Sequence, residues 1–444
     1  MIRRIVPALL IGLLLATPVA RAEPFALQAR VQTLDRLAGL IEVNYVFKNV
    51  AKTVAADVRG WKADPDLLAA PDERSFASIV TARLVKTDSH FNFRWSPPGE
   101  TPAENIAGPN NAAADREAAA ANYGFDAVQR LPGNIGYIRM NAFAAFDPKL
   151  TGAKTPAARR AAEAALTFLQ NTDAVIFDIR ENGGGSPAMI DLLLSGFFGD
   201  KPVLLNRFYR RKNDQTVDFT TLANFAGKRR PDVPLYVLVS GSTGSAAEEF
   251  AYDVQTQKRG TLIGETTYGG ANPGDVFDAG DGFTVFISTG AAVNPITGTN
   301  WDKIGVKPDI AVASADALAR AEELAVRTII AKGGASPTLT EARWTLERLT
   351  AEKNGVKLDP KSAQDLIGSY DDRQIGLEDG ALFYKRARSP EEQLVPLGGD
   401  AFAIAGRPNL RLTFERDSKG LVDALVISTS EGIVLSHKRD AATE

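Results

Sequence analysis

The chain has 444 residues, with 51 basic and 54 acidic side chains, a formal net charge of −3 and 44% hydrophobic residues. This mildly acidic balance, without a basic block, gives no reason to expect nucleic acid as a partner. The absence of cysteine excludes disulfides, thiolate metal sites, a cysteine nucleophile and a lipidated cysteine anchor. Only His90 and His437 are available for histidine-based chemistry.

The first residues have the pattern of a secretory signal. Two arginines precede a short apolar run at residues 5–16, and residues 20–22 (Ala-Arg-Ala) form a small-x-small cleavage site. The run is shorter than the roughly 20 residues that a membrane-spanning helix needs. We therefore expect residues 1–22 to be removed, the protein to be exported to the periplasm or the outside, and the mature chain to be soluble without a transmembrane segment.

Five regions follow along the chain. Helical spacing of apolar residues predicts a small helical domain over residues 23–95, and a stretch rich in Pro, Ala, Asn and Gly predicts a linker or strap over 96–130. Strands that alternate with helices over residues 131–334 predict an α/β layer with parallel pairing. A helical linker is expected over 335–360, and short apolar runs between turns predict a small antiparallel β domain over 361–444. The strands expected in the α/β layer lie at residues 135–140, 174–179, 235–239, 261–263 and 283–287.

The strongest local signal for chemistry lies at residues 239–250 (Val-Ser-Gly-Ser-Thr-Gly-Ser-Ala-Ala-Glu-Glu-Phe). A buried strand ends in small hydroxyl and glycine residues, and a helix begins directly afterwards. Ser245 would lie at the helix N-terminus, where free N–H groups and the helix dipole stabilise negative charge. That position suits a serine nucleophile, whose attack creates an oxyanion near its own backbone. Alternatively, Ser245 is only a helix cap, and Glu248 completes a capping box.

Two further segments could complete such a site. Three glycines at 183–185, between a strand and a helix, can point N–H groups at an anion and supply part of an oxyanion hole. A flexible turn is the alternative, whereas the spacings of a phosphate loop are absent. Residues 86–93 (Lys-Thr-Asp-Ser-His-Phe-Asn-Phe) contain His90, which could be the base that a serine nucleophile needs. A purely structural role for His90 is the alternative, and His437 has a poor setting for a base because Lys438 and Arg439 follow it.

Four ordered segments resemble signatures of the C-terminal-processing peptidase family. Residues 177–185 resemble Asp-Leu-Arg-x-Asn-x-Gly-Gly, and residues 245–248 resemble Ser-Ala-Ser-Glu. Residues 263–270 resemble Gly-Glu-x-Thr-x-Gly-Lys, and residues 305–310 match Gly-Val-x-Pro-Asp. The resemblance covers the middle region well and the helical region loosely, and it leaves the β tail outside.

The chain departs from the processing proteases in ways that favour the tricorn branch of the family. Gly270 stands where processing proteases have their lysine base. The tricorn branch instead uses a Ser-His pair from the helical region, which Ser89 and His90 resemble. That branch also has a glutamate before the Gly-Val-x-Pro-Asp run, where this chain has Asp302. The stretch between the helical region and the core is too short for the PDZ module that processing proteases usually carry.

The resemblance implies a fold and a reaction. The implied fold is α/β, a crotonase-like ββα superhelix preceded by a helical cap and followed by a small antiparallel β domain. The implied activity is that of a serine endopeptidase, carboxyl-terminal-processing-like, which cleaves a peptide or protein substrate with a histidine base and without metal or organic cofactor. The implied residues are the nucleophile Ser245, the base His90, Ser89 and Asp302 as the groups that orient and polarise the imidazole, and the N–H groups of Ala246, Gly183 and Gly184 as the oxyanion hole.

Two other functions stay open at this point. Retinoid-binding relatives of the family reuse the same core without proteolysis, so a passive peptide- or ligand-binding role is one alternative. Hydrolysis of a non-peptide ester, or acyl transfer from one, is another, since the same residues could perform it. The sequence predicts neither the natural substrate nor an oligomeric state.

Overall fold

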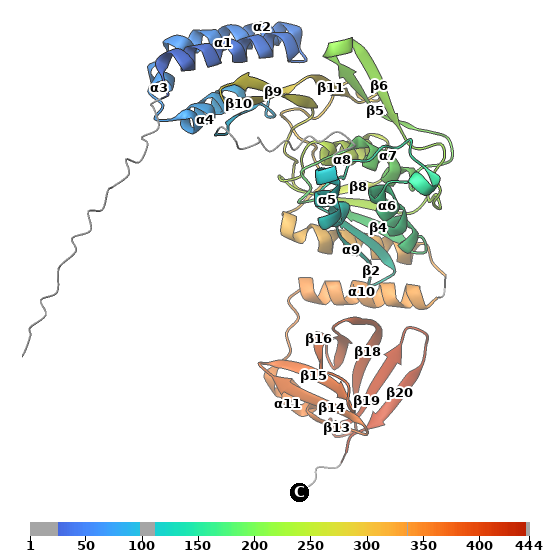
Figure 1. Cartoon of the computed structure of the whole chain (residues 1–444). Coiled ribbons are helices and arrows are strands. Elements are labelled where there is room, and N and C mark those ends of the chain that lie inside the picture. The colour runs from blue at the N-terminus through green and yellow to red at the C-terminus, as the bar shows by residue number, and fades with distance from the viewer. Residues whose placement is uncertain (1–24, 98–111, 335, 441–444) are drawn as a thin grey trace, which may run out of the picture.

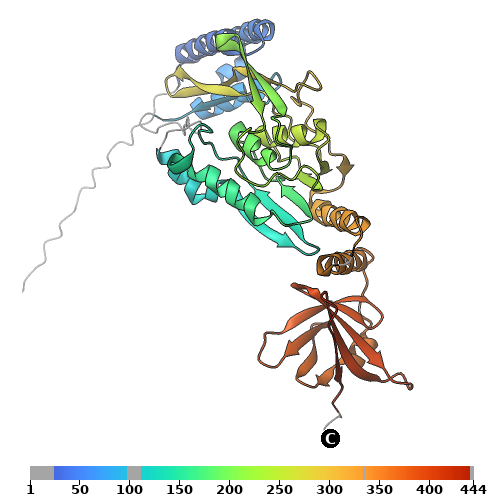
Figure 2. The same ribbon diagram turned by 90° about the vertical axis from the view of Figure 1, so that its right-hand side faces the viewer.

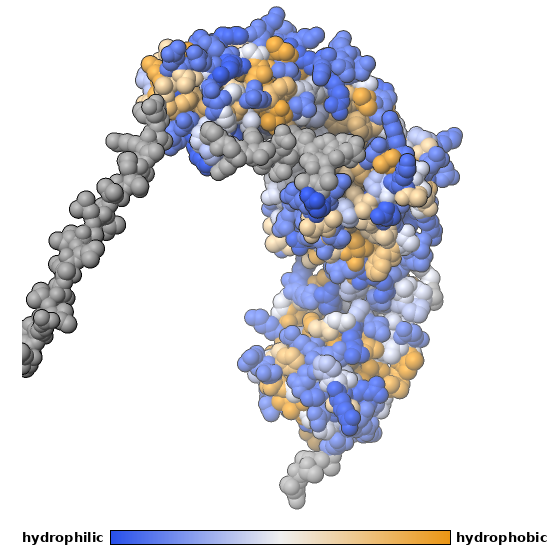
Figure 3. Space-filling model, viewed as in Figure 1, coloured by the Kyte–Doolittle hydropathy of each residue, from blue (hydrophilic) through white to orange (hydrophobic). Residues whose placement is uncertain are grey.

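The computed structural model describes residues 25–97, 112–334 and 336–440. The expected signal segment lies outside these ranges. Within them, no helix combines the length and the hydropathy that crossing a membrane requires. The face of the molecule seen in Figure 3 shows hydrophobic residues interspersed among hydrophilic ones.

A six-stranded sheet forms the centre of the molecule, in the order β12-β8-β7-β4-β3-β2. All neighbouring pairs are parallel except β2 and β3, which are antiparallel. Its strands are β2 (Phe125–Leu131), β3 (Ile135–Met140), β4 (Ala174–Asp178), β7 (Leu235–Val239), β8 (Thr261–Gly264) and β12 (Ile310–Ala311). β4 and β7 are buried along their whole length, which explains why they read as continuous apolar runs rather than as alternating ones. The predicted α/β layer is therefore confirmed.

Helices cover both faces of this sheet (Figure 1). Val175 and Phe177 of β4 face one core, which contains residues of α6 (Ala157–Phe168), α7 (Pro187–Ser195) and α8 (Ala246–Thr256). Ala174 and Ile176 face the opposite core with residues of α9 (Ala317–Ala331). This division follows from the alternation of side chains along a strand. It leaves the carboxyl ends of β4 and β7 free to carry the turns described below.

The N-terminal layer combines helices with a separate sheet. Its helical elements are α1 (Leu27–Asn44), α2 (Lys48–Gly60), η1 (Trp61–Ala63), α3 (Pro65–Leu68) and α4 (Glu73–Leu84). They pack on an antiparallel sheet of β1 (Asn92–Trp95), β10 (Phe283–Ser288) and β9 (Gly274–Gly280). The expected strand at residues 283–287 exists, but its place in the α/β layer was wrong. Phe283 and Ile287 of β10 instead complete the apolar core under the helices.

Two smaller corrections concern the linker and the core region. The expected linker at residues 96–130 contains α5 (Ala112–Ala120), η2 (Asn122–Gly124) and β2, because Phe125 packs in the central core and β2 pairs with β3. A third sheet, in the order β11-β5-β6, was not anticipated. Its strands are β5 (Leu204–Arg210), β6 (Gln215–Thr220) and β11 (Gly290–Val293), and single turns η3 (Gly152–Lys154), η4 (Arg211–Asn213) and η5 (Ser314–Asp316) punctuate the region.

The C-terminal region is an antiparallel β structure, as predicted. After α10 (Pro337–Lys353) and α11 (Pro360–Leu366), eight strands follow one another in chain order. They are β13 (Gly368–Tyr370), β14 (Arg373–Glu378), β15 (Ala381–Arg386), β16 (Glu392–Gly398), β17 (Ala401–Ile404), β18 (Arg407–Arg416), β19 (Val422–Thr429) and β20 (Val434–Lys438). A bridge between Tyr370 and Arg439 joins the two ends of this sheet. α10 lies between α9 and the β strands, as Figures 1 and 2 show, and contacts both.

The dependence of the N-terminal layer on β10 can be tested at Phe283. Its ring is fully buried and stacks on Phe93 with 5.1 Å between ring centroids. Phe283→Ala should lower the free energy of unfolding by about 3–5 kcal/mol, the usual cost of removing a buried aromatic ring. Urea denaturation of the mature chain measures this loss. Phe168→Ala, at a position that is 63% exposed, should change stability by less than about 0.5 kcal/mol, and equal losses in the two variants would contradict the packing described.

Candidate active site

The carboxyl ends of β4 and β7 bring two turns together. The strands are parallel neighbours, with Asp178 opposite Leu238. The glycine turn after β4 therefore lies beside the turn that leads from β7 into α8. Gly244 of the second turn donates its N–H to the carbonyl oxygen of Asn182 in the first at 3.0 Å. The structure thus places two of the three segments singled out in the sequence in direct contact.

Ser245 has an unusual backbone conformation at the start of α8. Its φ is 52° and its ψ is −123°, a region that residues other than glycine rarely adopt and that costs about 1–3 kcal/mol. Glu248 does complete a capping box with Ser245, as the alternative interpretation of the sequence expected. A capping serine usually has an extended backbone, so capping alone does not account for this conformation. A sharp, strained strand-to-helix turn is how α/β hydrolases expose a nucleophilic serine. The strain therefore favours the nucleophile over the simple cap.

Two of the three N–H groups expected to bind an oxyanion are available. The N–H groups of Ala246 and Gly183 have no hydrogen-bond acceptor among the described residues. Gly184 was wrongly expected to contribute, because its N–H already donates to the side-chain oxygen of Asn182 at 2.8 Å. Gly184 is instead required for close approach: a Cβ at this residue would lie 2.8 Å from the Cβ of Ser245. The geometry leaves one oxyanion donor on each turn.

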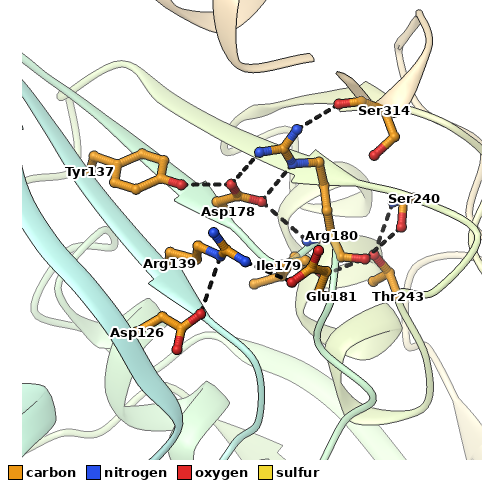
Figure 4. A network of polar contacts seen from close by, with 10 residues as sticks. All are labelled: Asp126, Tyr137, Arg139, Asp178, Ile179, Arg180, Glu181, Ser240, Thr243 and Ser314. Carbon is orange, nitrogen blue, oxygen red and sulfur yellow. Dashed lines mark hydrogen bonds and ion pairs between the residues drawn. The ribbon is translucent and has the colours of Figure 1, made fainter. Parts of the chain in front are cut away.

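A polar network fixes the glycine turn after β4 (Figure 4). The guanidinium of Arg180 donates two hydrogen bonds to Asp178, at 2.8 and 2.6 Å, and the Tyr137 hydroxyl donates a third at 2.7 Å. Burial raises the pKa of Asp178, but these hydrogen bonds outweigh it and the net shift is downward. Hydroxyl groups then tie the two turns together, with Ser240 donating to the carbonyl of Arg180 and Thr243 to that of Ile179.

The carboxylate of Glu248 joins the nucleophile turn to a second loop, formed by residues 265–271 and called here the base loop. Glu248 is fully buried. Its Oε2 accepts hydrogen bonds from the N–H of Ser245 at 2.9 Å and of Gly270 at 2.8 Å. Its Oε1 accepts from the Thr267 hydroxyl at 2.5 Å and from the Gly269 N–H at 2.6 Å. Burial raises the pKa of Glu248, and the hydrogen bonds oppose this rise. Since all four partners are donors, the geometry suits the ionised carboxylate.

His90 reaches this assembly through Gly270. A Cβ placed on Gly270 would lie 2.9 Å from both Cε1 and Nε2 of the imidazole. The ring therefore occupies space that any side chain at position 270 would take. Gly270 and Ser245 donate to the same oxygen of Glu248. Gly270 is therefore the residue that lies against the imidazole and is also tied, through Glu248, to the nucleophile turn. Glycine at position 270 therefore leaves the room that the imidazole of His90 occupies.

Two carboxylates surround the imidazole. Polar atoms of Asp88, His90 and Asp302 all lie within 4.8 Å of one another. The Oδ1 of Asp88 lies 3.5 Å from His90 Nδ1 and accepts the His90 backbone N–H at 2.9 Å. Burial raises the pKa of Asp88, but its hydrogen bonds with His90 outweigh this and the net shift is downward. Burial, followed by the charge of Asp88, raises the pKa of Asp302. Asp88 is therefore the acid better suited to remain ionised beside His90.

The structure differs from the sequence prediction at Ser89 and Asp88, the two residues that precede His90. The Ser89 hydroxyl donates to the carbonyl of Gly269 at 3.3 Å, so it contacts the base loop rather than the imidazole. Asp88 was not identified as a site residue from the sequence. The available signal was an aspartate two residues before a histidine, since such a side chain often accepts the N–H two residues on. The other histidine, His437, lies in β20 of the C-terminal sheet with its Nδ1 2.9 Å from Asp371.

Comparison with known proteins assigns this arrangement to a class. Residues 134–312 match the family model of Peptidase family S41. They cover the central sheet from β3 to β12, both turns, Glu248, the base loop and Asp302, whereas Asp88 and His90 precede them. Over these residues the chain is similar to the S41 peptidase family, and the relatives that it matches there are carboxyl-terminal-processing peptidases.

The relatives show how far the likeness extends. Carboxyl-terminal-processing peptidase 2 of Arabidopsis thaliana chloroplasts is 32% identical over 39% of this chain and 31% of its own length. The carboxy-terminal-processing protease of Bartonella bacilliformis is 27% identical over 41% of this chain and 40% of its own. The chain thus spans about a third of the first of these relatives. A putative peptidase from Parabacteroides merdae, solved as a crystal structure, is 19% identical with a TM-score of 0.45 and covers 65% of this chain and 90% of its own. The tricorn protease is 13% identical with a TM-score of 0.41, and the match covers 66% of this chain and 35% of that protein. These structural likenesses carry no functional inference.

Three further acids lie beside the helix that carries the site; Glu249 and Asp253 are buried and Asp191 is half-buried. Glu249 and Asp253 belong to α8, and Asp191 belongs to α7. Burial raises the pKa of Asp191 to about 8. Burial, together with the charge of Asp191, raises that of Glu249 to about 8, and burial also raises the pKa of Asp253. The fold therefore favours the protonated form of these carboxyl groups to higher pH than in the unfolded chain.

This cluster predicts the pH dependence of stability. A carboxyl with a pKa near 4 when unfolded and about 8 when folded binds more protons in the folded state, so stability falls as pH rises between these values. The free energy of unfolding of Asp191→Asn should fall less than that of the unaltered chain between pH 5 and pH 8, by roughly 1–3 kcal/mol at 1.36 kcal/mol per pKa unit. Urea titrations at the two values measure this. Asp57→Asn, at an exposed position, should behave like the unaltered chain, and identical pH slopes for all three proteins would refute the account.

Proposed function

We propose that this protein is an exported serine peptidase with Ser245 as nucleophile and His90 as base. One observation supports this most strongly: the buried carboxylate of Glu248 accepts the N–H groups of both the strained Ser245 and Gly270, and the imidazole of His90 lies against Gly270. The Ser245–Glu248 hydrogen bond by itself completes a helix capping box. A cap does not need Gly270 and an imidazole beside it, whereas nucleophilic catalysis needs a serine and a base in fixed positions. The S41 family match supports the same chemistry.

The reaction follows the general logic of a serine nucleophile and a histidine base. His90 Nε2 removes the proton from the Ser245 hydroxyl as its oxygen attacks the carbonyl carbon of the scissile peptide. The N–H groups of Ala246 and Gly183 hold the oxyanion that forms. His90 then donates its proton to the leaving amine, and a water molecule, deprotonated by the same imidazole, hydrolyses the acyl-enzyme.

The acids and the serine beside His90 have different parts in this proposal. Asp88 Oδ1 lies 3.5 Å from His90 Nδ1. When this distance shortens to a hydrogen bond during catalysis, Asp88 fixes the tautomer whose lone pair is on Nε2 and stabilises the imidazolium. Asp302 closes the other side of the imidazole and adds negative charge when ionised. Ser89 holds the base loop through Gly269. The sequence-predicted groups therefore stay in the site, and Asp88 takes over the orienting role that was given to Ser89 and Asp302.

The finer fold, the substrate and the location belong to the same proposal. The parallel run of β3, β4, β7 and β8 with helices on both faces supports a crotonase-like ββα superhelix. The names of the relatives state carboxyl-terminal processing, which supports a peptide or protein substrate cleaved near its carboxyl end. The signal-like pattern of residues 1–22 supports export. The β domain from residue 361 onward contributes no residue to the site described.

The nucleophile can be identified by covalent labelling. A fluorophosphonate probe should modify the mature chain at Ser245, since this reagent requires an activated serine. Peptide mass mapping locates the adduct. Ser242→Ala alters the same turn without touching the nucleophile and should still be labelled, whereas Ser245→Ala should not. Undiminished labelling of Ser245→Ala would show that another residue is the nucleophile.

The base can be identified by comparing the two histidines. His90→Ala should reduce peptide turnover and labelling by about 10²–10⁴-fold, the usual effect of losing a general base. His437→Ala should leave both nearly unchanged, because His437 lies in the C-terminal sheet. Asp88→Asn should cost more than Asp302→Asn, since Asp88 contacts Nδ1. Full activity of His90→Ala, or loss of labelling on replacement of one lysine such as Lys303, would point to a different base.

A further inference from the structure

The group around the imidazole has unsatisfied polar atoms that catalysis alone does not explain. Asp88 is fully buried, and its Oδ2 has no hydrogen-bond partner among the described residues. His90 Nδ1 is also buried without a hydrogen bond of ordinary geometry, since it stands 3.5 Å from Asp88 Oδ1. The nearby Ser288 hydroxyl is directed to the carbonyl of Asn272 at 3.3 Å. Buried polar atoms without partners are uncommon and call for an explanation.

The same atoms have the chemistry and spacing of metal ligands. One imidazole nitrogen and two carboxylates lie within 4.8 Å of one another. Ligand atoms about 2.0–2.2 Å from a tetrahedral Zn²⁺ are about 3.3 Å apart, close to the 3.5 Å between His90 Nδ1 and Asp88 Oδ1. The ligand atom of Asp302 lies within 4.8 Å of the other two and would move toward them when a metal binds. A mixed nitrogen and oxygen ligand set suits Zn²⁺ and its first-row neighbours better than Mg²⁺ or Ca²⁺.

The charges of the group also favour a cation. Within the described ranges, no lysine or arginine forms an ion pair with Asp88 or Asp302. The exposed Lys303 follows Asp302 in the chain and makes no contact of that kind. The buried Tyr45 hydroxyl lies near both acids, and the charge of Lys303 acts on Asp302 without an ion pair. Among the described residues, His90 is therefore the one cationic side chain paired with either carboxylate. A divalent ion would neutralise both.

We propose that Asp88, His90 and Asp302 form a binding site for a divalent transition-metal ion of the Zn²⁺ type, and that the bound ion reversibly inhibits the peptidase. An imidazole that ligates a metal through Nδ1 carries its remaining proton on Nε2. That nitrogen then has no lone pair with which to take the proton of Ser245, so the base is lost while the ion stays bound. The inhibition rests on the proposed function, whereas the binding does not.

The binding is tested on the full mature chain with Ser245→Ala, which removes the nucleophile and leaves the ligands in place. Calorimetric titration with ZnCl₂ should give one site per chain. A further His90→Ala change should abolish it, and Asp302→Asn should weaken it at least 10-fold. His437→Ala is the matched control, because it removes the other histidine–carboxylate pair, and it should leave the affinity unchanged. Co²⁺ in place of Zn²⁺ should give visible absorption that His90→Ala removes.

Inhibition is tested separately on the chain that retains Ser245. Zn²⁺ should slow fluorophosphonate labelling of Ser245 in step with occupancy of the site, and EDTA should restore the rate. Absence of stoichiometric binding, or binding that survives His90→Ala but is lost in His437→Ala, would overturn the metal site. Stoichiometric binding at His90 with no effect on labelling would overturn the inhibition alone. A chain that binds Zn²⁺ at His90 but never labels at Ser245 would refute the proposed function and leave the metal site standing.

Discussion

The buried carboxylate of Glu248 is the interaction on which the candidate site depends. It sits one turn into α8 and accepts one hydrogen bond from the nucleophile residue and three from the base loop. A buried ionised group is costly unless its oxygens are hydrogen-bonded. Four donors offset part of this cost here, although burial still raises the pKa of Glu248. The same four bonds fix the position of Gly270 relative to Ser245. The base loop, against which His90 packs, is therefore held to the nucleophile turn by the hydrogen bonds of Glu248.

The proposed nucleophile and base come from different cores of the molecule. Ser245 lies at the edge of the central sheet, whose core includes Ala246 and Phe250 of α8. His90 lies between α4 and β1, in the layer whose core includes Phe91 and Phe283. β9 and β10 leave the catalytic region and complete that second layer, so the base loop that precedes them crosses from one core to the other. Stability of the N-terminal layer and placement of the base are thus coupled.

Much of the site could be predicted from the sequence, because its segments are short and keep their chemistry in the chain. Ser245 and the glycines at 183–185 lie in contacting turns, and His90 packs against Gly270, while their catalytic roles stay predictions. The role of Asp88 could not be foreseen, since only the folded loop shows which carboxylate faces Nδ1. Gly184 was assigned wrongly because Asn182, two residues earlier, takes its N–H. The sheet of β10 was also assigned wrongly, because an apolar strand pattern gives burial but not the identity of its partner strand.

The central claim, that Glu248 holds the nucleophile and the base loop in register, can be tested with Glu248→Gln in the mature chain. This change keeps the size of the side chain but replaces one acceptor oxygen with an NH₂ group, which would face backbone or hydroxyl donors. We expect fluorophosphonate still to modify Ser245, but at a rate at least about 10-fold lower, as for misplaced catalytic groups, in a chain that remains folded by circular dichroism. Labelling at the unaltered rate in a folded Glu248→Gln chain would show that the site does not depend on this carboxylate.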